Sequence, residues 1–162
     1  MIVDVGGGNA TLMTEIMAAY HEPLGIVFDV PRLTDAARKT IEAAGLIRRC
    51  RFMGGNALDE VPTGGDADVF SNIVLTWEDD EAIRALRNCR KVMASQGRLL
   101  LVEWITPRAD EPKDSFRFWD TVMMDLVMLV TFGSRRGRVR TEEEFQALRN
   151  EARLHYPICN SY

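Results

Sequence analysis

Three glycines near the amino terminus are the residues whose type and spacing first indicate chemistry. Gly6, Gly7 and Gly8 follow a short, mainly apolar run, and apolar residues at helical spacing begin at Leu12. Glycine permits positive φ and carries no Cβ atom, so a ligand can approach its backbone closely. A helix behind such a loop presents unpaired N–H groups and a positive dipole end. The segment therefore predicts a strand, a ligand-binding loop and a helix, or else a strand–turn–helix corner that binds nothing.

The acid before the glycines narrows the chemistry of the ligand. The dinucleotide fingerprint Gly-x-Gly-x-x-Gly needs a third glycine where this chain has Thr11. The segment instead reads Asp-x-Gly-x-Gly, formed by Asp4, Gly6 and Gly8. A carboxylate there disfavours a pyrophosphate but suits a cationic amino-acid group. S-adenosylmethionine (SAM) carries such a group, together with a carboxylate for the helix N-terminus, and SAM is therefore the predicted cofactor.

A second acid ends the next predicted strand. Asp29 follows the apolar run 24–28 and lies 23 residues after Gly6. This separation is close to the roughly 20 residues expected for a carboxylate that binds a ribose in a βαβ unit. The alternative role is an N-cap of the next helix, in whose first turn Pro31 would stand. The two roles are compatible.

The remaining elements must place these residues in one fold. Further strands are predicted at 51–53, 67–75 and 98–104, and helices at 31–44 and from Thr76 to about 94. Strands that alternate with helices predict an open, doubly wound α/β sheet. Ligands of such sheets bind beyond the carboxyl ends of the strands, where the glycines and Asp29 would lie.

The carboxyl-terminal part contains two further predicted helices. Residues 116–132 carry apolar side chains on nearly every side, which predicts a helix that is buried all round or packs on something else. Its methionines suit an adaptable pocket for an aromatic substrate, although plain core or a subunit contact remains an alternative. Thr141, with Glu144 three residues later, predicts a capping box at the start of the last helix.

Composition excludes several classes of protein. The 162 residues support one domain, and a net charge of −4 without a basic face argues against a nucleic-acid partner. The basic run 135–140 is interpreted as a solvated loop rather than a binding patch. Cys50, Cys89 and Cys159 lack metal or redox spacing, so we expect no metal site and a reducing, cytoplasmic location. No apolar run reaches the roughly 18 residues of a membrane span.

Six motifs taken together resemble one known family. The chain is similar, over residues 2 to about 152, to the catalytic domain of small-molecule SAM-dependent O-methyltransferases, which methylate plant phenolics and bacterial polyketides. The motifs that carry this resemblance are Val3-Asp4-Val5-Gly6-Gly7-Gly8, Phe28-Asp29-Val30-Pro31, Gly55-Asn56-Ala57-Leu58, Trp77-Glu78-Asp79-Asp80-Glu81, Gly97-Arg98-Leu99-Leu100 and Arg140-Thr141-Glu142-Glu143-Glu144-Phe145. The resemblance implies a Rossmann-like class I methyltransferase sheet.

The resemblance also implies roles for individual residues. Gly6 and Gly8 would approach the methionine portion of SAM, and Asp29 would hold the ribose. Asn56 stands where the family has an aspartate that binds the adenine amino group. The other implied contacts are Ala57 with adenine, and Ser71, Thr76 and Trp77 with the cofactor. The apolar pattern of helix 116–132, rather than the resemblance, makes Trp119, Met123, Met124 and Met128 the candidate substrate contacts.

The chain departs from the family where the catalytic base is expected. Family members usually read Leu-His-Asp-Trp, and alignment on Trp77 places Leu75 at the histidine and Thr76 at the aspartate. Leucine cannot accept a proton, and neither His21 nor His155 has a neighbour that marks it as catalytic. The catalytic residue is therefore unassigned. Positioning alone can lower an activation barrier by several kcal/mol, whereas a general base typically accelerates a reaction by about 10²–10⁴-fold.

The ends are the second departure. The resemblance implies a helical N-terminal dimerisation domain and a final antiparallel hairpin, and we expect both to be missing or incomplete in residues 1–162. The predicted function is methyl transfer from SAM to a hydroxyl of a small aromatic or polyketide substrate, by a homodimer. The alternatives are a SAM-binding relative without methyl transfer, of hydroxylase type or non-catalytic, and an inactive fragment.

Overall fold

The computed structural model describes residues 1–107, 116–133 and 137–154. The strands are β1 (Ile2–Val5), β2 (Gly25–Asp29), β3 (Cys50–Gly54), β4 (Ala67–Ser71) and β5 (Arg98–Val102). The helices are α1 (Thr11–Ala19), α2 (Thr34–Ala43), α3 (Asp79–Val92), α4 (Phe116–Phe132) and α5 (Glu142–Glu151), with short 3-10 helices η1 (Pro31–Leu33) and η2 (Val74–Thr76).

All strands of the described sheet run parallel, in the order β3-β2-β1-β4-β5. Val3 of β1 pairs with Ile26 on one side and with Asp68 on the other. The chain order therefore reverses on either side of β1, which makes the carboxyl ends of β1 and β4 the switch point where ligands of such sheets bind. The predicted open, doubly wound α/β sheet is confirmed.

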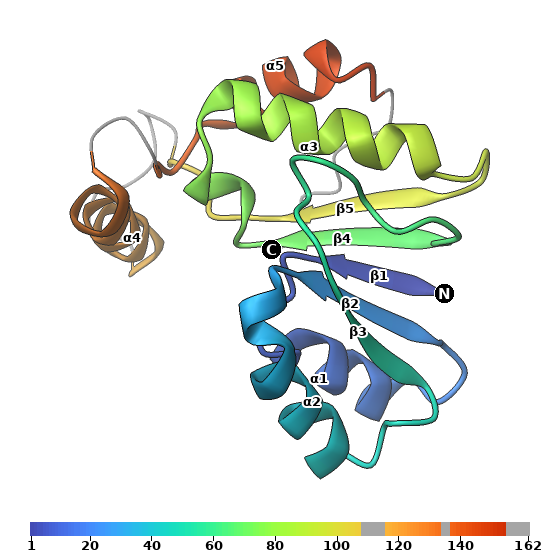
Figure 1. The fold of residues 1–162 in the computed structure, drawn as a ribbon. Coiled ribbons are helices and arrows are strands. Elements are labelled where there is room, and N and C mark those ends of the chain that lie inside the picture. The colour runs from blue at the N-terminus through green and yellow to red at the C-terminus, as the bar shows by residue number, and fades with distance from the viewer. Residues whose placement is uncertain (108–115, 134–136, 155–162) are drawn as a thin grey trace.

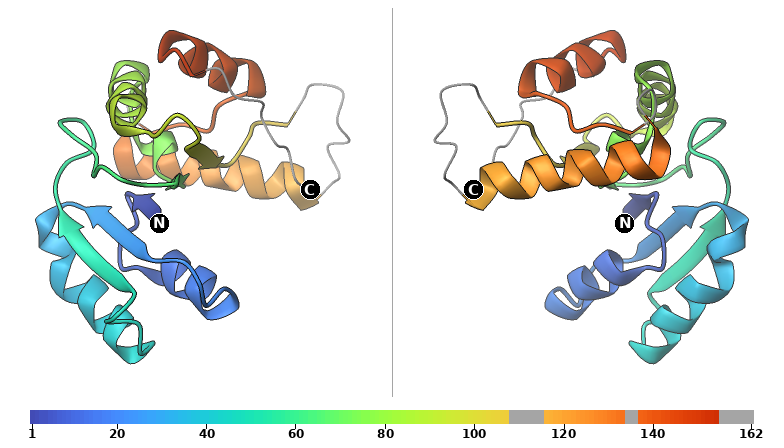
Figure 2. Two further views of the ribbon diagram at one scale, coloured as in Figure 1. Left: turned by 90° about the vertical axis from the view of Figure 1, so that its right-hand side faces the viewer. Right: turned by 90° about the vertical axis from the view of Figure 1, so that its left-hand side faces the viewer.

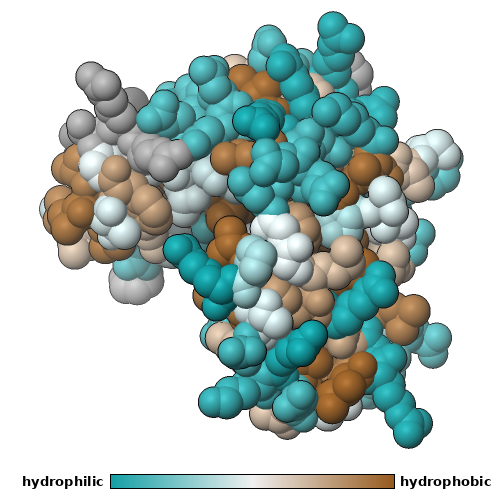
Figure 3. Space-filling model, viewed as in Figure 1, coloured by the Kyte–Doolittle hydropathy of each residue, from teal (hydrophilic) through white to brown (hydrophobic). Residues whose placement is uncertain are grey.

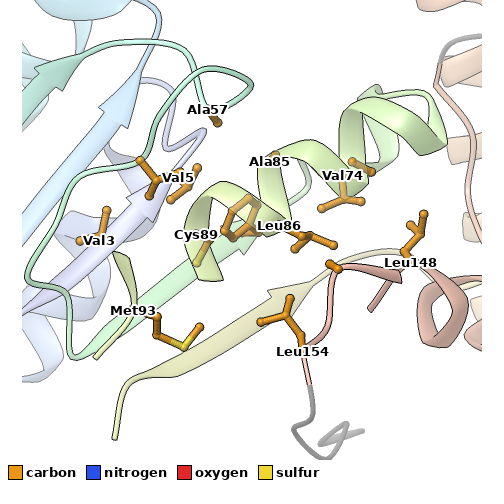
Figure 4. Packing of buried hydrophobic residues seen from close by; sticks show 14 of the residues in the cluster. Val3, Val5, Ala57, Val74, Ala85, Leu86, Cys89, Met93, Leu148 and Leu154 are labelled. Carbon is orange, nitrogen blue, oxygen red and sulfur yellow. The ribbon is translucent and has the colours of Figure 1, made fainter. Parts of the chain in front are cut away.

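Helices cover both faces of the sheet (Figures 1 and 2). Alternate strand residues point to opposite faces, so Val27 packs with Met13 and Met17 of α1, whereas Ile26 and Phe28 lie on the other face. The second face holds the larger core, in which α3 and α5 pack on β1, β4 and β5 (Figure 4). Helices α1, α3 and α5 therefore each bury an apolar side against the sheet.

The fourth strand is shorter than its apolar sequence predicts. The predicted strand 67–75 ends at Ser71, because Asn72 adopts positive φ of 52° and the chain then turns into η2. Asparagine tolerates this left-handed conformation better than most residues. The fifth strand also ends early, at Val102, and Glu103 beyond it binds backbone N–H groups of the turn after β4.

Capping explains where the later helices begin. Thr141 and Glu144 form the predicted capping box of α5, with Glu144 N–H donating to Thr141 Oγ1 at 3.2 Å and Thr141 N–H to Glu144 Oε2 at 2.8 Å. Asp29, by contrast, does not cap α2. That helix starts after Leu33 without a side-chain cap, and Pro31 instead opens η1. The N-cap interpretation of Asp29 is wrong, since its carboxylate binds the glycine loop instead.

Helix α4 has the predicted bounds but not a fully buried environment. It lies beyond the carboxyl ends of the strands and packs against η2 (Figure 1). Thr121 and Met128 are buried, whereas Trp119 is 57% exposed and Val130 79%. Its surface forms an apolar area at the left of Figure 3. Plain core is therefore the wrong interpretation for most of this helix within the described chain.

Candidate functional site

The glycine loop after β1 is shaped by close backbone contacts. Gly6 has φ of +78° and donates its N–H to Phe28 O at 2.8 Å, so the loop is tied to the end of β2. A Cβ atom at Gly6 would lie 2.6 Å from the side chain of Ile73. Gly8 has φ of +57° and nothing within 4 Å of its Cβ position. Gly6 is therefore required by packing, while Gly8 leaves open space beside the backbone.

This open space is a pocket of about 200 Å³. The lining residues are Asp4, Gly6, Gly7, Gly8, Asn9, Thr11, Leu12 and Ser71. The structure thus brings together four of the residues that the sequence singled out, namely Asp4, Gly6, Gly8 and Ser71. The sequence analysis missed Asn9, Thr11 and Leu12, although their position directly after the glycines was the available signal. Complete ligand pockets measure roughly 300–1,000 Å³, so this pocket accommodates part of a ligand.

Asp4 is a buried acid at the base of the pocket. Its side chain is 2% exposed, and its Oδ2 atom has no hydrogen-bond partner. Burial, followed by the nearby charge of Asp29, raises the pKa of Asp4 to about 6. A buried oxygen without a partner is costly and is usually satisfied by a ligand or water. The site therefore offers one acceptor to a cationic or hydrogen-bond-donating group.

Asp29 joins the end of β2 to the glycine loop. Its Oδ2 atom accepts the N–H of Gly8 at 2.9 Å, and its Oδ1 atom accepts the N–H of Val30 at 2.6 Å. Each carboxylate oxygen has a second lone pair, so the same side chain can still accept hydrogen bonds from a ligand. Asp29 therefore lies beside the pocket and holds the loop that forms it.

Asn56 and Ala57 follow β3 next to Asp29. The N–H of Gly55 donates to Asp29 O at 2.9 Å, which places the segment beside the end of β2. Asn56 Oδ1 accepts the N–H of Leu58 at 3.0 Å, and Ala57 is buried in the larger core. The Asn56 side chain is thus engaged within its own turn, and neither residue lines the 200 Å³ pocket.

The polar and aromatic residues after β4 also lie away from that pocket. The Thr76 hydroxyl donates to Ile73 O at 2.6 Å, and the Trp77 ring packs edge-on against Phe70 with 6.4 Å between centroids. Leu75, which stands at the usual histidine position, is buried. Trp77 also lines a separate hollow of about 340 Å³ with Glu78, Asp79, Asp80 and Arg138. Arg138 pairs there with Asp79, at 3.4 Å.

Glu103 and Arg140, which the sequence analysis did not single out, hold the turn that follows β4. Glu103 Oε1 accepts the N–H groups of Ile73 and Val74 at 2.9 and 2.8 Å. Burial raises the pKa of Glu103 to about 7, although these N–H groups and the charge of Arg140 act in the opposite direction. An acid directly after an apolar strand was the signal that could have identified Glu103, since ligand sites of α/β sheets lie at such strand ends.

Arg140 corrects the interpretation of the basic run. Arg140 is fully buried and donates to Asp79 Oδ1 at 2.8 Å, while Arg138 pairs with Glu144 at 2.6 Å. Burial opposes ionisation of Asp79, but the hydrogen bonds and charges of Arg140 and Arg138 outweigh it and lower its pKa. The solvated-loop interpretation is therefore wrong for Arg138 and Arg140, because each finds carboxylate partners on α3 or α5. The residues 134–136 lie outside the described ranges.

The residues predicted to contact substrate lie on different sides of α4. Trp119 and Met123 are 57% and 54% exposed, Met124 is partly buried and Met128 is buried. Of the two histidines, His21 is exposed beyond the end of α1, and His155 lies outside the described residues. In the described ranges, no group of three or more His, Cys, Asp or Glu side chains is arranged to hold a metal ion, and no helix is long and apolar enough to cross a membrane.

Comparison with known proteins assigns the chain to a family. The family model of the O-methyltransferase domain matches residues 1–154. The chain belongs to the O-methyltransferase domain family. Among curated relatives, the phenazine O-methyltransferase of Lysobacter antibioticus is 38% identical over 147 residues, which cover 91% of this chain and 40% of that protein. The chain therefore spans about 40% of the length of this relative.

Solved structures agree with this assignment. The mitomycin 7-O-methyltransferase superposes with a TM-score of 0.83 at 29% identity, over 93% of this chain and 42% of that one. An O-methyltransferase from neocarzinostatin biosynthesis, solved with SAM and 2-hydroxy-5-methyl naphthoic acid, gives a TM-score of 0.78 at 29% identity, over 93% and 42%. The O-methyltransferase domain thus has the class I methyltransferase fold that the sheet order indicated.

Burial of Asp4 makes the stability of this O-methyltransferase domain depend on pH. Because its pKa is raised in the folded state from 3.8 to about 6, the folded state binds the proton more tightly than the unfolded state. The free energy of unfolding therefore falls as pH rises between these values, by on the order of 3 kcal/mol. Asp4→Asn removes this titration. The free energy of unfolding of the variant, relative to that of the parent, should therefore rise by that amount from about pH 4 to pH 7.

Urea unfolding followed by circular dichroism across this pH range measures the difference. Asp35→Asn makes the same change from acid to amide at an exposed position on α2 and is the matched control. A difference for Asp4→Asn that does not vary with pH would show that burial does not perturb this carboxyl.

Proposed function

We propose that this domain binds SAM and transfers its methyl group to a hydroxyl of a small aromatic or polyketide substrate. The observation that carries the proposal is the glycine-loop pocket, in which an unpartnered buried oxygen of Asp4 lies next to Gly7, and Gly8 leaves open space beside its backbone. Family membership supports it, as do relatives named for phenazine and mitomycin methylation. The neocarzinostatin relative, which was solved with SAM and a hydroxynaphthoic acid, provides the same support.

The pocket residues suit the amino-acid part of SAM. Asp4 provides a negative charge for its ammonium group, because the Oδ2 atom has no partner within the described protein. Gly8 has room for a ligand beside its backbone, and Ser71 contributes a hydroxyl from the end of β4. Asp29, next to the loop, would accept hydrogen bonds from the ribose. Asn56, Ala57, Thr76 and Trp77 remain weaker candidates, since none of them lines the pocket.

When bound, SAM supplies a methyl group on a positively charged sulfur. Transfer of this group to the substrate hydroxyl would form a C–O bond as the C–S bond breaks, with the electron pair left on sulfur and the hydroxyl proton passing to water. Leu75 cannot accept this proton, so the domain acts mainly by orienting the substrate oxygen towards the methyl carbon. Orientation of this kind contributes several kcal/mol to lowering a barrier.

A second candidate function follows from the same residue. Leu75 at the usual base position is buried and not titratable, which favours a domain that binds SAM without methyl transfer. The chain also spans only about 40% of its first relative, which is consistent with a piece that is inactive by itself. Binding and transfer must therefore be measured separately.

The binding half of the proposal is tested at Asp29. Asp29→Ala should weaken SAM binding by about 1–3 kcal/mol, because it leaves the ribose hydroxyls without a charged acceptor. Isothermal titration calorimetry measures the dissociation constant. Asp29→Asn keeps an oxygen that can accept the Gly8 N–H and should show a smaller loss. Equal binding by Asp29→Ala and the parent would remove Asp29 from the site.

The transfer half is tested at the histidines. We expect methylation of a panel of phenols and hydroxyquinones, followed by formation of S-adenosylhomocysteine, to survive replacement of both His21 and His155 by Gln. The reason is that Leu75 stands at the usual base position and no histidine of the described chain lines the pocket. A loss of about 10² or more in turnover, with folding intact, would reveal a histidine base. SAM binding without turnover by the parent would favour the second candidate function.

We also infer that the domain forms a homodimer through α4. Trp119, Met123, Leu126 and Val130 of this helix are each about half exposed or more, which is unusual for so many large apolar side chains on one helix. Contiguous apolar surface of this kind marks partner contacts or aggregation sites. A two-fold dimer is the simplest assembly that covers the same surface on two chains.

Light scattering over a range of concentrations tests this association. The parent should show a mass that approaches the dimer at high concentration, whereas Trp119→Asp and Met123→Asp should shift it towards the monomer, because each places a charge in the contact. Ile47→Asp is the matched control, since Ile47 is 65% exposed on another part of the surface. A monomer mass at all concentrations for the parent would contradict the dimer.

A further inference from the structure

The turn formed by residues 73–77 connects β4 to α3 and touches both parts of the proposed site. On one side, the Ile73 side chain occupies the space that a Cβ atom at Gly6 would need, so the turn contacts the glycine loop. On the other side, η2 within the turn packs against α4 (Figure 1). A displacement of this turn would therefore change the packing against Gly6 and the support of α4 together, although no residue of the turn lines the 200 Å³ pocket.

The N–H groups of the turn converge on one carboxylate. Glu103 Oε1 accepts from Ile73 at 2.9 Å and from Val74 at 2.8 Å, while Oε2 lies 3.4 Å from the N–H of Leu75. Successive N–H groups that point to a common centre form an anion-binding concavity. The carboxylate of Glu103, which follows β5, occupies this concavity in place of an external anion.

The carbonyl groups of the same turn are held by arginine. Arg140 donates from Nη1 to Val74 O at 2.8 Å and from Nη2 to Trp77 O at 2.7 Å. Its Nε and Nη2 atoms also donate to Asp79 Oδ1 at 3.0 and 2.8 Å, at the first residue of α3. The backbone N–H of Arg138 completes the set by donating to Leu75 O at 2.9 Å. The turn is thus bound through both its donors and its acceptors.

Stability alone does not explain these charged residues. Arg140 is fully buried and Glu103 is partly buried, and buried ionic groups are commonly no more stabilising than apolar side chains of similar size. These residues instead fix the position of the backbone, because hydrogen bonds are directional. We propose that Glu103 and Arg140 are positioning residues that together fix the turn 73–77, and with it Leu75, against the glycine loop and α4.

This inference rests on the proposed function for its catalytic consequence. Without a base at position 75, turnover depends on how accurately the substrate oxygen is aligned with the methyl carbon. A misplacement of about 1 Å costs up to about 10²-fold in rate. The two positioning residues touch neither SAM nor substrate in this scheme, and they act through the backbone of the turn.

A tryptophan within the turn reports its position without any need for activity. Trp77 is the only one of the three tryptophans in this turn, so Trp104→Phe and Trp119→Phe isolate its fluorescence. In that background, Glu103→Ala and Arg140→Met should each increase quenching of Trp77 by acrylamide. Glu103→Gln and Arg140→Lys, which keep an acceptor or a charged donor, should increase it less. Glu60→Ala, an exposed acid before β4, is the control and should match the parent.

Activity and binding assays then separate a positioning role from the alternatives. Glu103→Ala should lower kcat by about 10–100-fold while the SAM dissociation constant from calorimetry stays close to that of the parent, and Glu103→Gln should recover part of kcat. If Glu103→Ala does not fold, Glu103→Gln and Arg140→Lys are compared with the parent in its place. If the parent shows no turnover, the proposed function fails, and the quenching data still decide the positioning role.

Two outcomes would overturn the inference. Unchanged Trp77 quenching in folded Glu103→Ala and Arg140→Met would show that neither residue fixes the turn. A loss of kcat in Glu103→Gln as large as that in Glu103→Ala, with quenching unchanged, would show that Glu103 acts on the substrate itself as a base.

Discussion

The parallel pairing of β1 with β2 on one side and β4 on the other is the constraint on which the structure depends. Because the chain order reverses at β1, the connections after β1 and β4 run to opposite faces of the sheet, and ligands of such sheets bind in the crevice between them. The glycine loop after β1, Asp29 at the end of β2 and Ser71 at the end of β4 therefore meet at one edge of the sheet. Contacts across this edge are close, since Gly6 lies against Ile73 and its N–H binds Phe28 O.

Two acids near this edge of the sheet, Asp4 and Glu103, reduce the stability of the fold when they are charged. Asp4 and Glu103 both carry raised pKa values, with burial as the first cause, so each charge destabilises the fold near neutral pH. Asp4 keeps an oxygen without a partner beside the pocket, whereas Glu103 satisfies N–H groups of the neighbouring turn. Such departures from an apolar interior are typical of functional sites. One acid is thus available to a ligand, and the other is engaged by the protein backbone.

The apolar surface of α4 gives the same domain a second requirement. Thr121 and Met128 face the rest of the protein, and Asp125 Oδ1 accepts the N–H of Val139 at 2.9 Å, so one side of the helix is anchored. The opposite side remains exposed within the described chain, and exposed apolar surface of this kind marks partner contacts or aggregation sites. In the proposed dimer, the helix that packs on η2 would also form the contact between the two chains.

The sequence by itself determined the order of the strands and helices, the start of the last helix and the residues of the glycine loop. Local patterns sufficed for these features, because hydrophobic periodicity and glycine spacing are properties of neighbouring residues. Asp4, Gly6, Gly8 and Asp29 were identified in this way, and so was the capping box of Thr141. Their proximity at one edge follows from the general rule for parallel sheets.

Only the tertiary structure decided which polar groups find partners. Asp29 binds the loop instead of capping a helix, and the turn after β4 is held by Glu103, which lies 32 residues after Ser71 in sequence. Arg140 was assigned to solvent because its sequence neighbours are basic, yet it is buried against Asp79 and the turn. The apolar composition of α4 likewise did not show which of its side chains are exposed. Each of these features depends on contacts between distant segments, and their energies are fixed by burial and geometry that a local pattern does not contain.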